Sequence, residues 1–176
     1  GIEHGNFEYR KKYLKRNVSD ELQIKAFEMV ADKKYTACAN SIIGMPDETR
    51  ELIFDTIKFV RKLPKTIDAT GAFVFAPYHG TPLRELAIKK GYITKDAIAS
   101  VSNTAHVSML TMPTISKEEI RGLDRVFSFY VKFPESRWND IKVAEKFDDK
   151  GNAMFSKLRE EFDNQEGISK SLDLHG

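Results

Sequence analysis

The chain has 176 residues, 41% of them hydrophobic and 31% charged, which is typical of a globular protein built around its own core. The 28 basic and 26 acidic residues leave a net charge of +2, too balanced to indicate a nucleic-acid partner. The sequence excludes a membrane span, because no run of about 18 apolar residues occurs. It also lacks a secretory signal, so we expect a cytoplasmic protein.

Cysteine and histidine content limits the metal chemistry of the chain. Cys38 is the single cysteine, so no internal disulfide can form and the chain alone cannot hold a four-iron cluster. Its apolar surroundings predict a small buried side chain. The four histidines (His4, His79, His106 and His175) lack the spacing of a metal site.

The N-terminal residues predict a strand end, a turn and two helices. Residues 1–5 indicate a strand running into a glycine-bounded turn, and residues 7–16 a short helix with a solvated basic face. Ser19, followed by two acidic residues, is typical of a helix N-cap. The helix should continue to Asp32 and turn its apolar residues toward the core.

Two later segments are typical of buried parallel strands. Residues 35–43 and 69–76 are short, apolar and without clean alternation, as expected where helices cover both faces of a sheet. Between them, Asp47 or Thr49 can cap a helix that ends near Leu63. Strand, helix and strand joined by short connections indicate a right-handed crossover and a parallel sheet.

The remaining sequence is mainly helical. A loop with two prolines precedes a short helix at 83–90, and residues 92–115 predict a long covering loop. Ser116 opens a capping box and a helix to about Phe133. Further helices are expected near 136–146 and 152–163, followed by a frayed end.

Polar residues lie at the predicted strand ends, where parallel α/β sheets bind ligands. Glu3 can hold a ligand hydroxyl or ammonium group, or simply be an exposed turn carboxylate. Asn40 would be a buried amide, which costs a few kcal/mol unless backbone, water or ligand pairs with it. Arg16 can bind a carboxylate through two parallel hydrogen bonds.

Three segments in this order and spacing carry a resemblance: GIEHGNFEYRKKYLKRN, ANSIIGMPDETRELIFDTI and FVFAPYHGTPLRELAIKKGYI. Together they resemble the C-terminal half of the barrel of radical S-adenosylmethionine (SAM) enzymes. The resemblance implies an α/β fold, a partial (half) TIM-like barrel with parallel strands over residues 1–93. Residues 94–176 would form a covering loop and an α-helical C-terminal extension.

The resemblance implies roles in binding SAM for six residues. Glu3 matches a polar residue near the methionine or ribose, and Asn40 one that bonds the ribose hydroxyls. Arg16, with Lys15 as the one-residue alternative, matches an arginine that contacts the SAM carboxylate. The adenine side is matched by the backbone of Ile42 and by Pro77 and Tyr78, which close over the ring.

Two turn residues depart from the family pattern. Asp47 stands where a glycine is common, and His79 where a proline is common. The CxxxCxxC motif of the family, which binds the 4Fe-4S cluster, has no counterpart in this chain.

The resemblance therefore implies that this chain carries only part of the function of a complete enzyme. In the complete enzyme, reductive cleavage of SAM at a 4Fe-4S cluster yields a radical for chemistry or methyl transfer on a substrate that the sequence does not identify. This chain would position SAM, with no catalytic or metal-ligating residue of its own, and would pair with the missing N-terminal half of the barrel. The segment from Met112 onward is similar to tails of members with a cobalamin-binding domain, which implies cobalamin as a further cofactor.

Two other hypotheses remain open. The chain can be a non-catalytic α/β binding or scaffold module, which predicts no nucleotide affinity. It can also be part of an aldolase-like barrel, but residues 35–43 and 69–76 lack the strand-end lysine or paired carboxylates of such a site.

Overall fold

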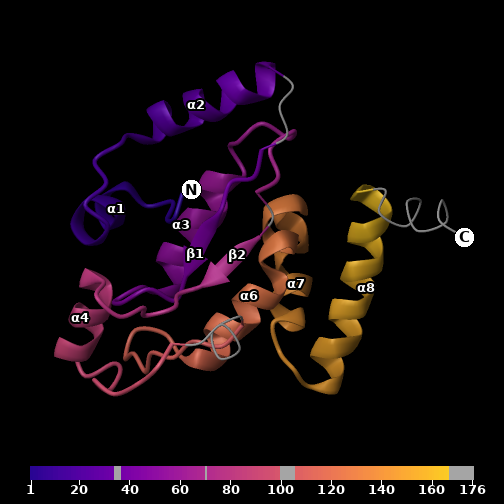
Figure 1. The fold of residues 1–176 in the computed structure, drawn as a ribbon. Helices are drawn as coiled ribbons and strands as arrows, with labels where there is room; N and C mark the ends of the chain where they lie inside the picture. Colours follow the sequence, from indigo (N-terminus) through magenta and orange to yellow (C-terminus); the bar gives the residue numbers. More distant parts are fainter. Residues whose placement is uncertain (34–36, 70, 100–105, 167–176) are drawn as a thin grey trace, which may run out of the picture.

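A computed structural model describes residues 1–33, 37–69, 71–99 and 106–166. Helices dominate around a short parallel sheet, and the N-terminus and α4 lie at opposite ends of that sheet (Figure 1). In chain order the elements are α1 (Phe7–Tyr13), α2 (Asp20–Asp32), β1 (Ser41–Ile43), α3 (Arg50–Val60), β2 (Ala72–Val74), α4 (Pro82–Lys89), α6 (Lys117–Lys132), the 3-10 helix η1 (Glu135–Arg137), α7 (Trp138–Ala144) and α8 (Asp149–Glu166).

The sheet is parallel, as predicted. β1 and β2 pair with Ile42 opposite Phe73, and α3 connects them. On the other side of β1, Glu3 forms a parallel bridge with Ser41. Three extended segments therefore lie next to one another, with β1 in the middle.

One face of this sheet is covered and the other is open. Ser41, Ile43 and Val74 are buried on the covered face. Successive strand residues point to opposite sides, so Asn40 and Ile42 share the opposite face with Phe73, which is 59% exposed. Asn40, Ile42 and Phe73 are called the open face below. The expectation that helices cover both faces was wrong for the described residues.

Two burial predictions fail for the same reason. Cys38 and Asn40 are both exposed, because their positions in the alternation place them on the side away from the core. Ala39 and Ser41, their neighbours, are the residues that face the core. The amide of Asn40 therefore needs no internal partner.

Helix starts match the sequence closely. Ser19 and Thr49 accept hydrogen bonds from the backbone three residues on and cap α2 and α3. Thr81 caps α4 in the same way, and Ser116 forms the predicted capping box with Glu119. Each pattern is local, so a short stretch of sequence suffices to specify it.

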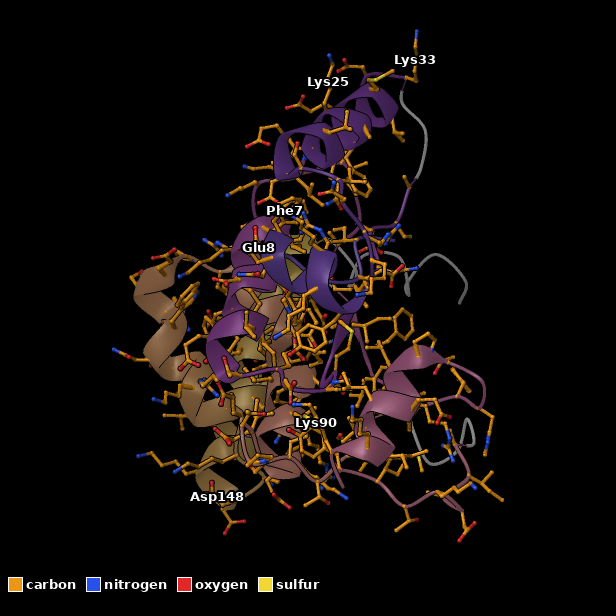
Figure 2. The ribbon with its side chains drawn as sticks, turned by 90° about the vertical axis from the view of Figure 1, so that its left-hand side faces the viewer. Phe7, Glu8, Lys25, Lys33, Lys90 and Asp148 are labelled. Carbon is orange, nitrogen blue, oxygen red and sulfur yellow. The ribbon has the colours of Figure 1, made fainter. Side chains whose placement is uncertain are left out.

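The burial predicted for α2 is wrong, although its limits are right. Leu22 and Met29 are 59% and 62% exposed, and no residue of α2 is fully buried. α2 lies at the edge of the molecule, with Lys25 and Lys33 pointing outward (Figure 2). Its inner side packs against a small cluster around Ile2 and Phe59.

The main core lies between the covered face and the C-terminal helices. α6, α7 and α8 pack next to one another on one side of the sheet (Figure 1). Phe129 of α6 contacts Phe155 and Phe162 of α8, with ring centroids 5.4 and 5.7 Å apart. Within the described residues, no helix is long and apolar enough to cross a membrane.

Arg61 joins α3 to the end of α6. Its Nη1 donates to the carbonyl oxygens of Tyr130, Val131 and Phe133 at 2.7–2.9 Å. We expect Arg61→Met to lower the free energy of unfolding by about 1–2 kcal/mol, because these carbonyls lose their donor. Urea denaturation measures the change. Lys58→Met, at an exposed position of α3, is the control, and an equal loss in both variants would contradict this role.

Candidate functional site

Glu3 and Arg16 lie beside the open face and contact each other. Arg16 Nη1 is 3.4 Å from Glu3 Oε1 and donates to the carbonyl oxygen of Gly1 at 3.0 Å. Both hydrogen bonds between the Arg16 side chain and the described residues use Nη1. The guanidinium is 44% exposed, so it remains accessible to a carboxylate ligand.

Asn40 joins this pair through its backbone. Its carbonyl oxygen accepts hydrogen bonds from the amides of Ile2 and Glu3 at 2.9 and 3.1 Å. Its side chain is exposed on the open face. Three of the predicted SAM-binding residues, Glu3, Arg16 and Asn40, are therefore neighbours.

The backbone of Glu3 has an uncommon conformation. Its φ is +65°, and the amide of His4 donates back to the carbonyl oxygen of Ile2 at 2.9 Å, closing a tight three-residue turn. The carbonyl oxygen of Glu3 accepts from the amide of Ile42 at 2.7 Å. The resemblance implies that the backbone of Ile42 contacts adenine, but the Ile42 amide is already hydrogen-bonded within the protein.

A buried pair of polar side chains supports this turn. His4 Nε2 is 3.0 Å from Glu48 Oε1, and both side chains are fully buried. Glu48 Oε2 also accepts from the amides of Gly44 and Met45, at the end of β1. His4 Nδ1 accepts from the amide of Asn6 at 3.0 Å, so Nε2 is the ring nitrogen that faces Glu48. His4 and Glu48 thus link the Glu3 turn to the β1 turn.

Arg10 is a structural residue that the sequence did not distinguish from its basic neighbours. It is 1% exposed. Its Nη1 donates to the carbonyls of His4 and Gly5, and its Nη2 to the carbonyl of Val18 and to Asp20. The basic run therefore includes one buried arginine that fixes the turn after Glu3.

Pro77 and Tyr78 lie at the other end of the strand pair. Both follow the C-terminal end of β2, whereas Asn40 precedes β1. Pro77 is buried and its carbonyl oxygen accepts from Arg84 Nη1 at 2.9 Å. Tyr78 is 53% exposed. The structure brings Glu3, Arg16 and Asn40 into contact, and it places Pro77 and Tyr78 on a separate flank.

The open face presents the Asn40 amide and the exposed Phe73 ring, and the Glu3–Arg16 pair lies beside it. These groups suit a ligand with hydroxyls, a carboxylate and a flat ring. Two hollows of about 430 and 360 Å³ lie elsewhere, on α8 and beside the end of α3. Among the described residues no group of three potential metal ligands occurs.

Comparison with known proteins gives one distant relationship. No family model matches the chain. The chain is similar to an uncharacterized methyltransferase of Pyrococcus horikoshii, with 28% identity over 148 residues that cover 66% of this chain and 32% of the relative. The chain thus spans about a third of the length of the curated relative it matches.

Proposed function

We propose that this chain is the SAM-positioning part of a methyl-transferring enzyme of the radical SAM superfamily. The observation on which the proposal depends is that Asn40 and the Glu3–Arg16 pair meet beside an exposed apolar face. The relative named as a methyltransferase supports use of SAM as the methyl donor. We further propose that residues 1–93 belong to a larger parallel barrel.

Each residue of the site has a distinct task in this proposal. The Asn40 amide bonds the ribose hydroxyls, since an exposed amide offers both a donor and an acceptor. Arg16 binds the methionine carboxylate, and Glu3 faces the ammonium group beside it. Phe73 and Ile42 provide an apolar surface for the adenine ring, with Tyr78 at its far edge.

The described residues do not fit a 4Fe-4S cluster. Cys38 is a lone exposed thiol, and no three potential ligands gather among the described residues. We therefore assign this chain only the binding and orientation of SAM. In the proposal, cluster binding belongs to the rest of the enzyme, and cobalamin stays an expectation from the tail.

Titration of the 176-residue chain with S-adenosylhomocysteine tests the proposal. We expect amide NMR shifts at residues 3, 16, 40–42 and 73. Asn40→Ala should weaken binding about two- to tenfold, because the exposed amide loses bonds to the ribose. Asn139→Ala changes an equally exposed asparagine on α7 and serves as the control.

The same titration distinguishes the alternative. A non-catalytic α/β binding or scaffold module predicts no response to S-adenosylhomocysteine. Shifts absent from the open face, or equal weakening by Asn40→Ala and Asn139→Ala, would reject the proposed adenosyl site.

A further inference from the structure

Asp47 lies at the centre of a group of donors that come from three parts of the fold. Its Oδ2 accepts from Tyr13 Oη at 2.8 Å and lies 2.8 Å from Lys90 Nζ. Its Oδ1 accepts from Tyr92 Oη at 2.6 Å. These four residues, Asp47, Tyr13, Lys90 and Tyr92, are called the Asp47 cluster.

The backbone of Asp47 adopts a conformation that favours glycine. Its φ is +64°, which lies in the left-handed region. Such a conformation persists where surrounding contacts determine it. The three hydrogen bonds of the carboxylate are contacts that a glycine, the residue common here in the resembling family, could not make.

The protonation behaviour of Asp47 agrees with these bonds. Partial burial acts to raise the pKa of its carboxyl, but hydrogen bonds from Lys90, Tyr92 and Tyr13 outweigh burial and hold the pKa below its usual value. The same contacts raise the pKa of Lys90 and of Tyr92. At neutral pH Asp47 is therefore an anion beside the cation of Lys90 and the neutral phenol of Tyr92.

On one side, the cluster connects to the Glu3–Arg16 pair. Tyr13 is the last residue of α1 and stacks on Tyr9, which in turn stacks on the buried His4. Arg16 follows Tyr13 by three residues, and its backbone amide donates to the carbonyl oxygen of Arg10, a residue of α1. The position of α1 thus sets the backbone of Arg16, from which the guanidinium reaches Gly1 and Glu3.

On the other side, the cluster connects to Tyr78. Lys90 caps the C-terminal end of α4, and in Figure 2 it lies between that helix and the rest of the molecule. Arg84 of α4 donates to the carbonyl oxygen of Pro77 and, through Nη2, to those of Lys95 and Ala97. The position of α4 therefore determines where the Pro77–Tyr78 loop lies.

We propose that Asp47 is a positioning residue that holds the two flanks of the open face, α1 with Arg16 and α4 with Tyr78, at a fixed separation. This inference rests on the proposed function in one respect: the separation of the flanks affects binding because the ligand contacts both of them. Asp47 lies in the turn after β1, where its side chain contacts both Tyr13 of α1 and Lys90 at the end of α4. A glycine at this position has no side chain and could not connect the two flanks.

Hydrogen exchange of three variants tests the link without any ligand. Asp47→Asn keeps the size and left-handed tendency of the residue but removes the charge, whereas Asp47→Gly also relieves the backbone. We expect both to speed exchange at least fivefold in residues 9–16 and 84–93, while α8 is unchanged. Asp140→Asn, which removes a carboxylate bonded to Arg137 in the C-terminal helices and away from both flanks, is the control.

A titration with S-adenosylhomocysteine then addresses function. Asp47→Asn should weaken binding about fivefold or more although Asp47 does not touch the ligand, and Lys90→Met should do the same. Unchanged exchange on either flank, or a uniform increase across the chain, would overturn the positioning role. If the parent chain does not bind S-adenosylhomocysteine but exchange changes as expected, the adenosyl proposal fails and the link between the flanks stands.

The stability difference between the parent chain and Asp47→Asn should depend on pH with a defined sign. Because folding lowers the pKa of Asp47, its contribution is present above the ordinary aspartate pKa of about 4 and disappears as pH falls through the folded value. Because the pKa values of Lys90 and Tyr92 are raised, both groups stay protonated and the contribution of Asp47 to stability persists up to about pH 10. Urea midpoints across this range give the curve; a difference that grows below pH 4 would contradict it.

Discussion

Replacing Glu48 by alanine is expected to lower the free energy of unfolding by about 3–5 kcal/mol. The carboxylate is fully buried, accepts from the amides of Gly44 and Met45, and lies 3.0 Å from His4 Nε2. Removing it leaves two buried amides without an acceptor, each at a cost of roughly 1–3 kcal/mol, and takes away the oxygen that faces His4 Nε2. The cavity left by the side chain adds to the loss. Urea denaturation followed by circular dichroism measures the change.

A second substitution keeps the experiment interpretable if the alanine variant does not fold. In Glu48→Gln the amide oxygen can still accept from Gly44 and Met45, but an NH2 group replaces the carboxylate oxygen that faces His4 Nε2. We therefore expect an intermediate loss of about 1–3 kcal/mol. Exposed Glu51, also near the start of α3, provides the control Glu51→Gln, which should stay within about 0.5 kcal/mol of the parent chain. A Glu48→Ala midpoint equal to that of the parent would exclude the buried pair.

Helix starts could be predicted from the sequence because they depend on neighbouring residues. Ser19, Thr49 and Ser116 each bond an amide three positions along, so their patterns are complete within four residues. The parallel pairing of two apolar segments around one helix was also predictable, since a short helical crossover permits few other topologies.

Burial on the sheet could not be predicted in the same way. Residues 35–43 have no clear alternation, so the sequence does not indicate which side chains face the core. Cys38 and Asn40 were expected inside and are exposed, while Ala39 between them and Ser41, the first residue of β1, are buried. The face of a short strand is determined by what covers it, and here the described helices cover one side only.

The residues that fix the candidate site were missed because their partners are distant in sequence. His4 and Glu48 are separated by 43 residues, and neither lies in a pattern that indicates an ion pair. Arg10 and Arg16 are equivalent members of one basic run, yet one is buried and the other is 44% exposed. The family resemblance suggested Arg16 as a ligand contact but gave no reason to expect Arg10 as its structural support.

Substituting alanine for Gly5 is the second change for which we expect a large effect. A β-carbon there would lie 2.4 Å from Thr56 Cα and 2.6 Å from the carbonyl oxygen of Asp55, so backbone atoms of α3 would have to move. The amide of Gly5 donates to Thr56 Oγ1 at 2.9 Å, and that bond would also lengthen. We expect Gly5→Ala to lower the free energy of unfolding by about 3 kcal/mol, at the upper end for overpacking.

The position of Gly5 makes this substitution informative about the site as well as about stability. Moving residue 5 away from α3 shifts the carbonyls that Arg10 holds and, two residues earlier, the Glu3 turn. We therefore expect Gly5→Ala to weaken S-adenosylhomocysteine binding under conditions in which the chain is still fully folded. Gly71→Ala is the matched control, since a β-carbon there meets no atom within 4 Å and the residue is exposed. Equal stability of the two variants would show that the N-terminal turn does not depend on close packing against α3, and Glu3 would then lack the rigid support that ligand binding requires.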